Sequence, residues 1–160
     1  MTAVPVVIGV RPPHAASAPQ AAGQEALGGG LVDTHGRVHR DLRISLTDRC
    51  SLRCTYCMPE QGNEWLARTS ILSTDEIVEV AEVAAALGIR TFRLTGGEPL
   101  LRGDIVEVVR RIARIEGEDG PVEVAMTTNG IILSLKLPDL IDAGLTRLNI
   151  SIDTVDRQRF

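Results

Sequence analysis

The sequence predicts an α/β fold in which parallel strands form an incomplete barrel. From Asp41 onward, β-type runs alternate with amphipathic helical runs at intervals of about 25–30 residues, which is typical of βαβ units with right-handed crossovers. Read at alternate positions, the strands are apolar on one face and polar on the other. A doubly wound sheet would be apolar on both faces, so this pattern favours a curved sheet whose interior is a binding cavity.

The elements follow one another as about four βα units. The expected strands are residues 41–47, 90–95, 122–127 and 147–153. The first helix begins after Ser73, which forms an S-x-x-E capping box with Glu76, and Gly88 ends it. The second helix has one apolar face, made by Ile105, Val108, Val109, Ile112 and Ile115. Pro138 is expected to limit the third helix, which leads to the fourth strand.

The first 40 residues differ from the rest of the chain. They are rich in Ala, Pro and Gly without an apolar period, so residues 1–40 are expected to be a flexible tail and residues 41–160 the barrel portion. The 160-residue chain is 44% hydrophobic with a formal charge of −4, and it has no apolar run of membrane-spanning length and no Lys/Arg run. We therefore expect no membrane and no nucleic-acid partner, and, without a signal-like N-terminus, a cytoplasmic location.

Parallel strands end on the same side of a sheet, so four loops are expected to converge. These are the loop with the cysteines and the GGEP, TTNG and SID segments. The expected polar face consists of Arg43, Ser45, Thr47, Arg93, Thr95, Thr127, Asn149, Ser151 and Asp153. Because an unpaired arginine is costly to bury, the two arginines indicate either an anionic ligand or a carboxylate partner such as Glu98 or Asp153.

All three cysteines lie in RCSLRCTYCMPE, at a C-x3-C-x2-C spacing. An odd number of such close neighbours makes no disulfide framework, so the cluster indicates a metal. Structural zinc requires four ligands, and His39, the nearest histidine, lies across a strand from the loop. An iron-sulfur cube normally has four thiolates, and three would leave one iron open to a substrate. The spacing favours the cube over zinc and leaves both possible.

The cysteine loop, with Tyr56 as an aromatic residue before the last cysteine, is followed by a strand that ends in GGEP. This combination resembles the radical S-adenosylmethionine (SAM) superfamily. The segments LTDRC, CMPE, FRLTGGEPLLR, MTTNG and DAGLTRLNISID further resemble the GTP 3',8-cyclases, over about residues 31–160.

The resemblance implies a partial, TIM-like barrel and a role for several residues. A [4Fe-4S] cluster would have three ligands, Cys50, Cys54 and Cys57. SAM would contact Tyr56, Gly97 and Ser151, and GTP would contact Arg43, Arg93 and Thr127. No side chain is implied as a catalytic acid or base, because the radical chemistry belongs to the cofactor.

The implied activity is that of a radical SAM lyase, which converts GTP to 3',8-cyclo-7,8-dihydro-GTP in the first step of molybdenum cofactor (molybdopterin) biosynthesis. It implies an external one-electron reductant and, as the next enzyme, cyclic pyranopterin monophosphate synthase. The family has a second cluster on three further cysteines, and this sequence has no fourth cysteine. We therefore expect an N-terminal portion of a longer enzyme that at most binds the SAM cluster. The alternatives are another radical SAM enzyme, such as a peptide-modifying maturase, or a non-enzymatic iron-sulfur or zinc-stapled module.

Overall fold

The computed structural model describes residues 4–6, 30–57 and 64–159. Five strands pair in parallel in one sheet, in the order β1-β4-β5-β8-β9. Their bounds are β1 Val4–Val6, β4 Asp41–Ser45, β5 Thr91–Thr95, β8 Glu123–Thr128 and β9 Arg147–Ile150. The strands from β4 onward are neighbours in both sequence and space, as successive βα units require.

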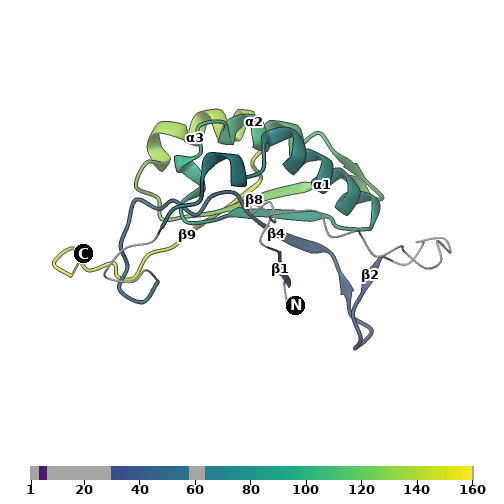
Figure 1. The fold of residues 1–160 in the computed structure, drawn as a ribbon, viewed down its shortest axis with the longest axis horizontal. Helices are drawn as coiled ribbons and strands as arrows, with labels where there is room; N and C mark the ends of the chain where they lie inside the picture. The colour runs from purple at the N-terminus through teal and green to yellow at the C-terminus, as the bar shows by residue number, and fades with distance from the viewer. Residues whose placement is uncertain (1–3, 7–29, 58–63, 160) are drawn as a thin grey trace.

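Three helices cover one face of this sheet (Figure 1). They are α1 Thr74–Ala86, α2 Ile105–Ile112 and α3 Leu133–Asp142. Two short 3-10 helices, η1 Arg68–Ser70 and η2 Pro99–Leu101, precede α1 and α2 along the chain. Because all three crossovers lie on the same side, the sheet is wound as in a barrel, which confirms the predicted incomplete TIM-like fold. Within the described residues, no helix is long and apolar enough to cross a bilayer.

The ends of the helices follow the sequence signals, with one exception. Ser73 Oγ accepts a hydrogen bond from the Glu76 backbone at 3.2 Å, and the Glu76 carboxylate accepts one from the Ser73 backbone at 2.9 Å, so the expected capping box is present. Gly88 follows α1 with φ +92. Pro138 lies inside α3 rather than limiting it. Proline at this position lacks the N–H that would bond to the carbonyl one turn earlier, and the helix nevertheless continues past it to Asp142.

The core lies between the helices and the apolar face of the sheet. One row of Cα partners across the sheet is Ile44, Leu94, Met126 and Leu148, and the first three are fully buried. The helices contribute buried side chains that include Ile77, Ala81, Val108, Ile112 and Leu140. The apolar positions of the last expected strand, residues 147–153, were expected on this covered face, but two of them, Ile150 and Ile152, are 54% and 58% exposed. They lie on and just beyond β9, which is an edge strand of the sheet.

Two hairpins and one strand were not expected from the sequence. The hairpins are β2 Leu31–Val32 with β3 Val38–His39, and β6 Glu116–Gly117 with β7 Gly120–Pro121. Strands of two residues are too short to show an alternating pattern. Together with β1, the first hairpin lies inside residues 1–40, which were expected to be a flexible tail; residues 1–3 and 7–29 of that expectation lie outside the described residues.

Candidate functional site

The end of β5 holds the chain that leads into the cysteine loop, Cys50–Cys57. The Gly97 backbone donates a hydrogen bond to the Thr47 carbonyl at 2.7 Å, and the Glu98 backbone donates one to the Arg49 carbonyl, also at 2.7 Å. These bonds continue the β4–β5 pairing past the ends of both strands. The first cysteine therefore begins its loop from a fixed backbone position.

The two glycines of GGEP are required by this close approach. Gly96 has φ +146, and a Cβ at this residue would lie 2.5 Å from the Thr47 carbonyl oxygen. A Cβ at Gly97 would lie 2.3 Å from the Arg49 carbonyl oxygen. Both contacts are with backbone and cannot be relieved by a side-chain rotation. This packing explains the two glycines, and the expected contact of Gly97 with SAM stays a prediction.

The carboxylate of Glu98 joins the end of β5 to the end of β8. Glu98 is 1% exposed. One of its oxygens accepts hydrogen bonds from the Leu100 backbone at 3.0 Å and from the Thr128 hydroxyl at 2.7 Å, and the other accepts one from the Asn129 backbone at 2.7 Å. A buried carboxylate held by three donors is a rigid connection. It places Asn129 at the site.

Asn129 in turn reaches the cysteine loop. Its side-chain nitrogen donates to Ser51 Oγ at 3.1 Å and to Cys50 Sγ at 3.8 Å. The Leu52 backbone donates to the same sulfur at 3.4 Å. The TTNG segment was expected to converge on this site, but no role was expected for Asn129. An amide directly after a buried strand was the signal available for it.

The three cysteines are free thiols, with Cys50 and Cys54 half-buried and Cys57 exposed. Within the described residues, no three His, Cys, Asp or Glu side chains lie close enough together to bind one metal ion. His39, the candidate fourth zinc ligand, lies in β3 with its ring nitrogen 3.6 Å from Asp33. Since each thiolate of a cube binds its own iron, three separate soft donors in one loop fit an iron-sulfur cluster better than a single zinc ion.

The cysteine loop is braced by a cation–π contact. The Arg53 guanidinium lies 5.3 Å from the centre of the Trp65 ring. The same guanidinium donates hydrogen bonds to the carbonyls of Cys50 and Leu52, both at 3.0 Å. Arg53 therefore links the start of the loop to the segment that follows it.

Two of the residues expected to contact SAM lie at the same end of the sheet. The Tyr56 hydroxyl donates to Asp153 at 2.8 Å, which joins the cysteine loop to the SID segment. This hydrogen bond, with a smaller contribution from Cys54, raises the pKa of Tyr56 to about 12. The Ser151 backbone donates to the Thr128 carbonyl at 2.8 Å. The predicted convergence of the four strand ends is therefore confirmed, while the ligands of these residues stay predictions.

The residues expected to contact GTP lie on the face that the helices leave open. Arg43 and Arg93 are Cα partners across β4 and β5, and Thr127 lies on the same face of β8, closer to the cysteine loop. The two carboxylates considered as their partners, Glu98 and Asp153, bond to other groups. Over the described ranges, neither arginine forms an ion pair. The phosphate contacts expected of the two arginines stay a prediction.

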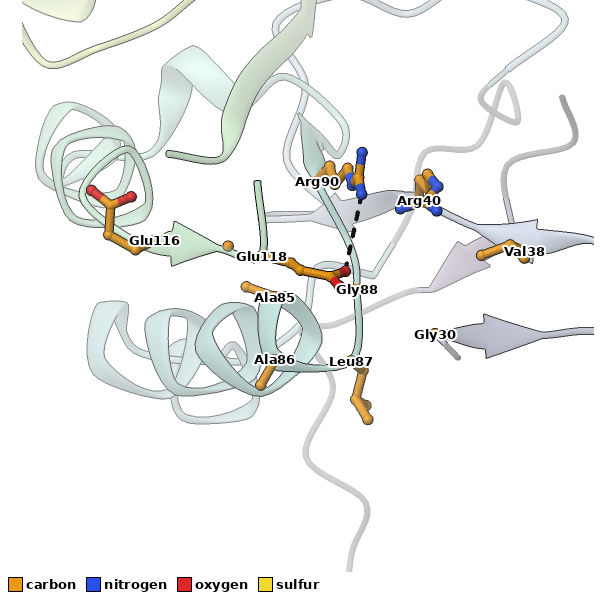
Figure 2. Close-up of a pocket in the computed structure, with 11 residues that line it drawn as sticks. Gly30, Val38, Arg40, Ala85, Ala86, Leu87, Gly88, Arg90, Glu116 and Glu118 are labelled. Atoms are coloured by element: carbon orange, nitrogen blue, oxygen red, sulfur yellow. Dashed lines mark ion pairs between the residues drawn. The ribbon is translucent and has the colours of Figure 1, made fainter. Parts of the chain in front are cut away.

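A cavity of about 510 Å³ lies at the opposite, amino-terminal end of the sheet (Figure 2). It is lined by Arg40, Arg90, Glu118 and the end of α1, and Arg90 and Glu118 form an ion pair across it at 4.0 Å. A second cavity, of about 580 Å³, lies beside the start of the cysteine loop, with Thr47, Arg49 and Arg102 in its wall. In α/β folds with parallel strands, ligands bind at the carboxyl ends, so the first cavity is not the candidate site.

The comparisons with known proteins agree with this geometry. The GTP 3',8-cyclase of Paenarthrobacter nicotinovorans is 47% identical over 134 residues, which are 83% of this chain and 37% of that protein. The enzyme of the same name from Streptomyces coelicolor is 52% identical over 126 residues, or 78% and 36% of the two chains. The chain spans just over a third of the length of these curated relatives.

A solved structure shows the same fold at low sequence identity. The crystal structure of BtrN in complex with AdoMet and 2-DOIA superposes with a TM-score of 0.53 and 14% identity, covering 77% of this chain and 50% of that one.

Residues 44–159 match the radical SAM superfamily. That match includes the three cysteines, the GGEP turn and all four strand ends described above. The chain belongs to the radical SAM superfamily.

Proposed function

We propose that this chain provides the cluster-binding and SAM-binding part of a GTP 3',8-cyclase. The observation that supports this most strongly is the bonding of Asn129 to the cysteine loop and of Glu98 to Arg49, the residue before that loop. Since Asn129 also bonds to Glu98, these contacts gather the loop and two strand ends at one site. The identity of about half of the aligned residues with enzymes named GTP 3',8-cyclase supports the choice of activity within the superfamily.

Cys50, Cys54 and Cys57 would hold a [4Fe-4S] cluster and leave one iron without a protein ligand. When reduced and bound to SAM, such a cluster supplies a radical that removes a hydrogen atom from the substrate. The protein's own contribution is to position the two ligands and to exclude water. The backbone bonds from Gly97 and Glu98 to the segment before Cys50 support a fixed position for this loop.

SAM would bind against Tyr56, Gly97 and Ser151. The proposal is supported by the exposure of all three residues at the end of the sheet where the cysteine loop lies. The Tyr56 hydroxyl is held by Asp153, so its ring has a defined orientation beside the loop. Gly97 exposes backbone without a side chain, which permits a close approach of a ligand.

GTP would bind on the open face of the sheet, with Arg43 and Arg93 on its phosphates and Thr127 nearer to the cluster. Guanidinium groups bind phosphate oxygens through two parallel hydrogen bonds, and a lysine would serve less well. The two arginines lie farther along the strands from the cysteine loop than Thr127 does. Bound to them, the phosphates of the nucleotide would point away from the radical. The proposed reaction also requires an external one-electron reductant, and its product would pass to cyclic pyranopterin monophosphate synthase.

The substrate part of this proposal goes beyond the binding of the SAM cluster expected from the sequence, and GTP binding to the reconstituted chain tests it. We expect the double variant R43A/R93A to bind GTP at least tenfold more weakly than the wild type, while SAM binding is unchanged. Arg114→Ala is the matched control, because Arg114 is exposed and follows α2 on the helical side of the sheet. Equal GTP affinity of the double variant and this control would exclude the arginine pair as the phosphate site.

A further inference from the structure

We infer that Asn129 is a positioning residue that raises the reduction potential of a cluster bound at Cys50. The inference rests on the proposed function, since it concerns the cluster that the three cysteines would hold. Its basis is the contact of the Asn129 side-chain nitrogen with Cys50 Sγ, at 3.8 Å. Neither the superfamily match nor the resemblance assigns a role to this residue.

The orientation of the Asn129 amide is fixed by its other bonds. Its side-chain oxygen accepts a hydrogen bond from the Ile131 backbone at 3.1 Å, so the nitrogen is the end that faces the cysteine loop. The Asn129 backbone donates to Glu98, which is almost fully buried. The side chain is therefore held at both its oxygen and its backbone, and the donor toward Cys50 is preorganised.

A donor at this place has a definite effect on electron transfer. Reduction adds one electron to the cluster and increases the negative charge on the ligand sulfurs. An N–H group that donates to such a sulfur stabilises the reduced form more than the oxidised form, and so raises the potential. The Leu52 backbone also donates to Cys50 Sγ, and substitutions of side chains leave this second donor in place.

Ser51 and Cys50 accept hydrogen bonds from the same amide nitrogen, so a shorter bond to Ser51 holds that nitrogen farther from the sulfur. The Asn129 nitrogen lies 3.1 Å from Ser51 Oγ and 3.8 Å from Cys50 Sγ, so the hydroxyl is the nearer acceptor. Removal of the hydroxyl in Ser51→Ala leaves the sulfur as the remaining acceptor for that amide. The two residues are thus expected to shift the potential in opposite directions, which a loss of local packing alone would not produce.

The experiment measures the reduction potential of the cluster in the full chain after anaerobic reconstitution with iron and sulfide. The chain is titrated with dithionite, and the spectrum of the reduced cluster is recorded at each step. We expect Asn129→Ala to lower the equilibrium constant for one-electron reduction about tenfold, a shift of about 59 mV. Ser51→Ala should give a higher potential than the wild type. Asn129→Asp keeps an acceptor for the Ile131 backbone and adds a negative charge, so it should give the lowest potential of the set.

The outcomes separate this inference from the function on which it rests. If the wild type takes up a cluster and Asn129→Ala has the wild-type potential, Asn129 does not tune the cluster, and only this inference fails. The same conclusion follows if Ser51→Ala lowers the potential. If the wild type takes up no cluster, the proposed function itself is wrong and this inference with it.

Discussion

Substitution of Gly97 by alanine tests the packing that fixes the cysteine loop. The added Cβ would lie 2.3 Å from the Arg49 carbonyl oxygen, so the two backbones must separate. Separation breaks the hydrogen bonds from Gly97 to Thr47 and from Glu98 to Arg49, each at 2.7 Å. At about 1 kcal/mol each, these bonds contribute about 2 kcal/mol. The steric clash of the added methyl group adds about 1–3 kcal/mol to this loss of stability. Alanine also restricts the unfolded chain more than glycine does, which offsets up to about 1 kcal/mol of the loss.

We therefore expect Gly97→Ala to lower the free energy of unfolding by about 2–5 kcal/mol, measured by urea denaturation. Iron uptake should fall as well, because Cys50 follows the displaced backbone. Gly103→Ala is the matched control, since a Cβ at Gly103 would meet nothing within 4 Å. If Gly97→Ala and Gly103→Ala unfold within about 0.5 kcal/mol of each other, the reasoning from the close backbone approach is refuted.

Three further predictions follow from the described contacts. Ser73→Ala removes one side of the capping box and should destabilise the chain by about 1 kcal/mol in thermal or urea unfolding. Glu98→Gln keeps one acceptor oxygen but places an amide N–H opposite the N–H of the Asn129 backbone. We expect the free energy of unfolding to fall by about 1–3 kcal/mol. An unchanged value would contradict the role of the buried Glu98 carboxylate in joining β5 to β8. The hydrogen bond from Arg102 lowers the pKa of Asp104 to about 2. Because this pKa lies below the usual value of 3.8, the ionised Asp104 stabilises the folded chain above pH 3.8, and this stabilisation is lost as the pH falls toward 2. The free energy of unfolding of Asp104→Asn, measured between about pH 4 and pH 2, should therefore fall less steeply than that of the wild type.

Much of the fold could be predicted from the sequence because its signals are local. The capping residue Ser73, the helix stop at Gly88 and the alternating strands act within a few residues of themselves. The polar face was predicted from the two-residue period of β4 and β5, and its register places Arg43 beside Arg93 as expected. The short hairpins could not be predicted, since strands of two residues carry no period. Pro138 was misjudged because the cost of a proline depends on its turn within the helix.

The place of the candidate site could be predicted from the sequence, but the residues that support it could not. Parallel topology alone implied that the strand ends meet, and the cysteine spacing indicated an open cluster. The roles of Glu98 and Asn129 depend on hydrogen bonds between residues about 30 and 79 positions apart, which no local pattern records. The same holds for the bond from Tyr56 to Asp153. These long-range contacts explain why the GGEP and TTNG turns, and not only the cysteines, define the site.

The most direct test of the account is the metal content of the anaerobically reconstituted chain, combined with the electron paramagnetic resonance spectrum of its reduced form with and without SAM. The account predicts about four irons per chain, a matching amount of sulfide, and a spectrum that changes when SAM is added. Replacement of Cys50, Cys54 and Cys57 by serine should abolish the iron. A colourless protein that holds one zinc ion, or a cluster whose spectrum does not respond to SAM, would contradict the central claim.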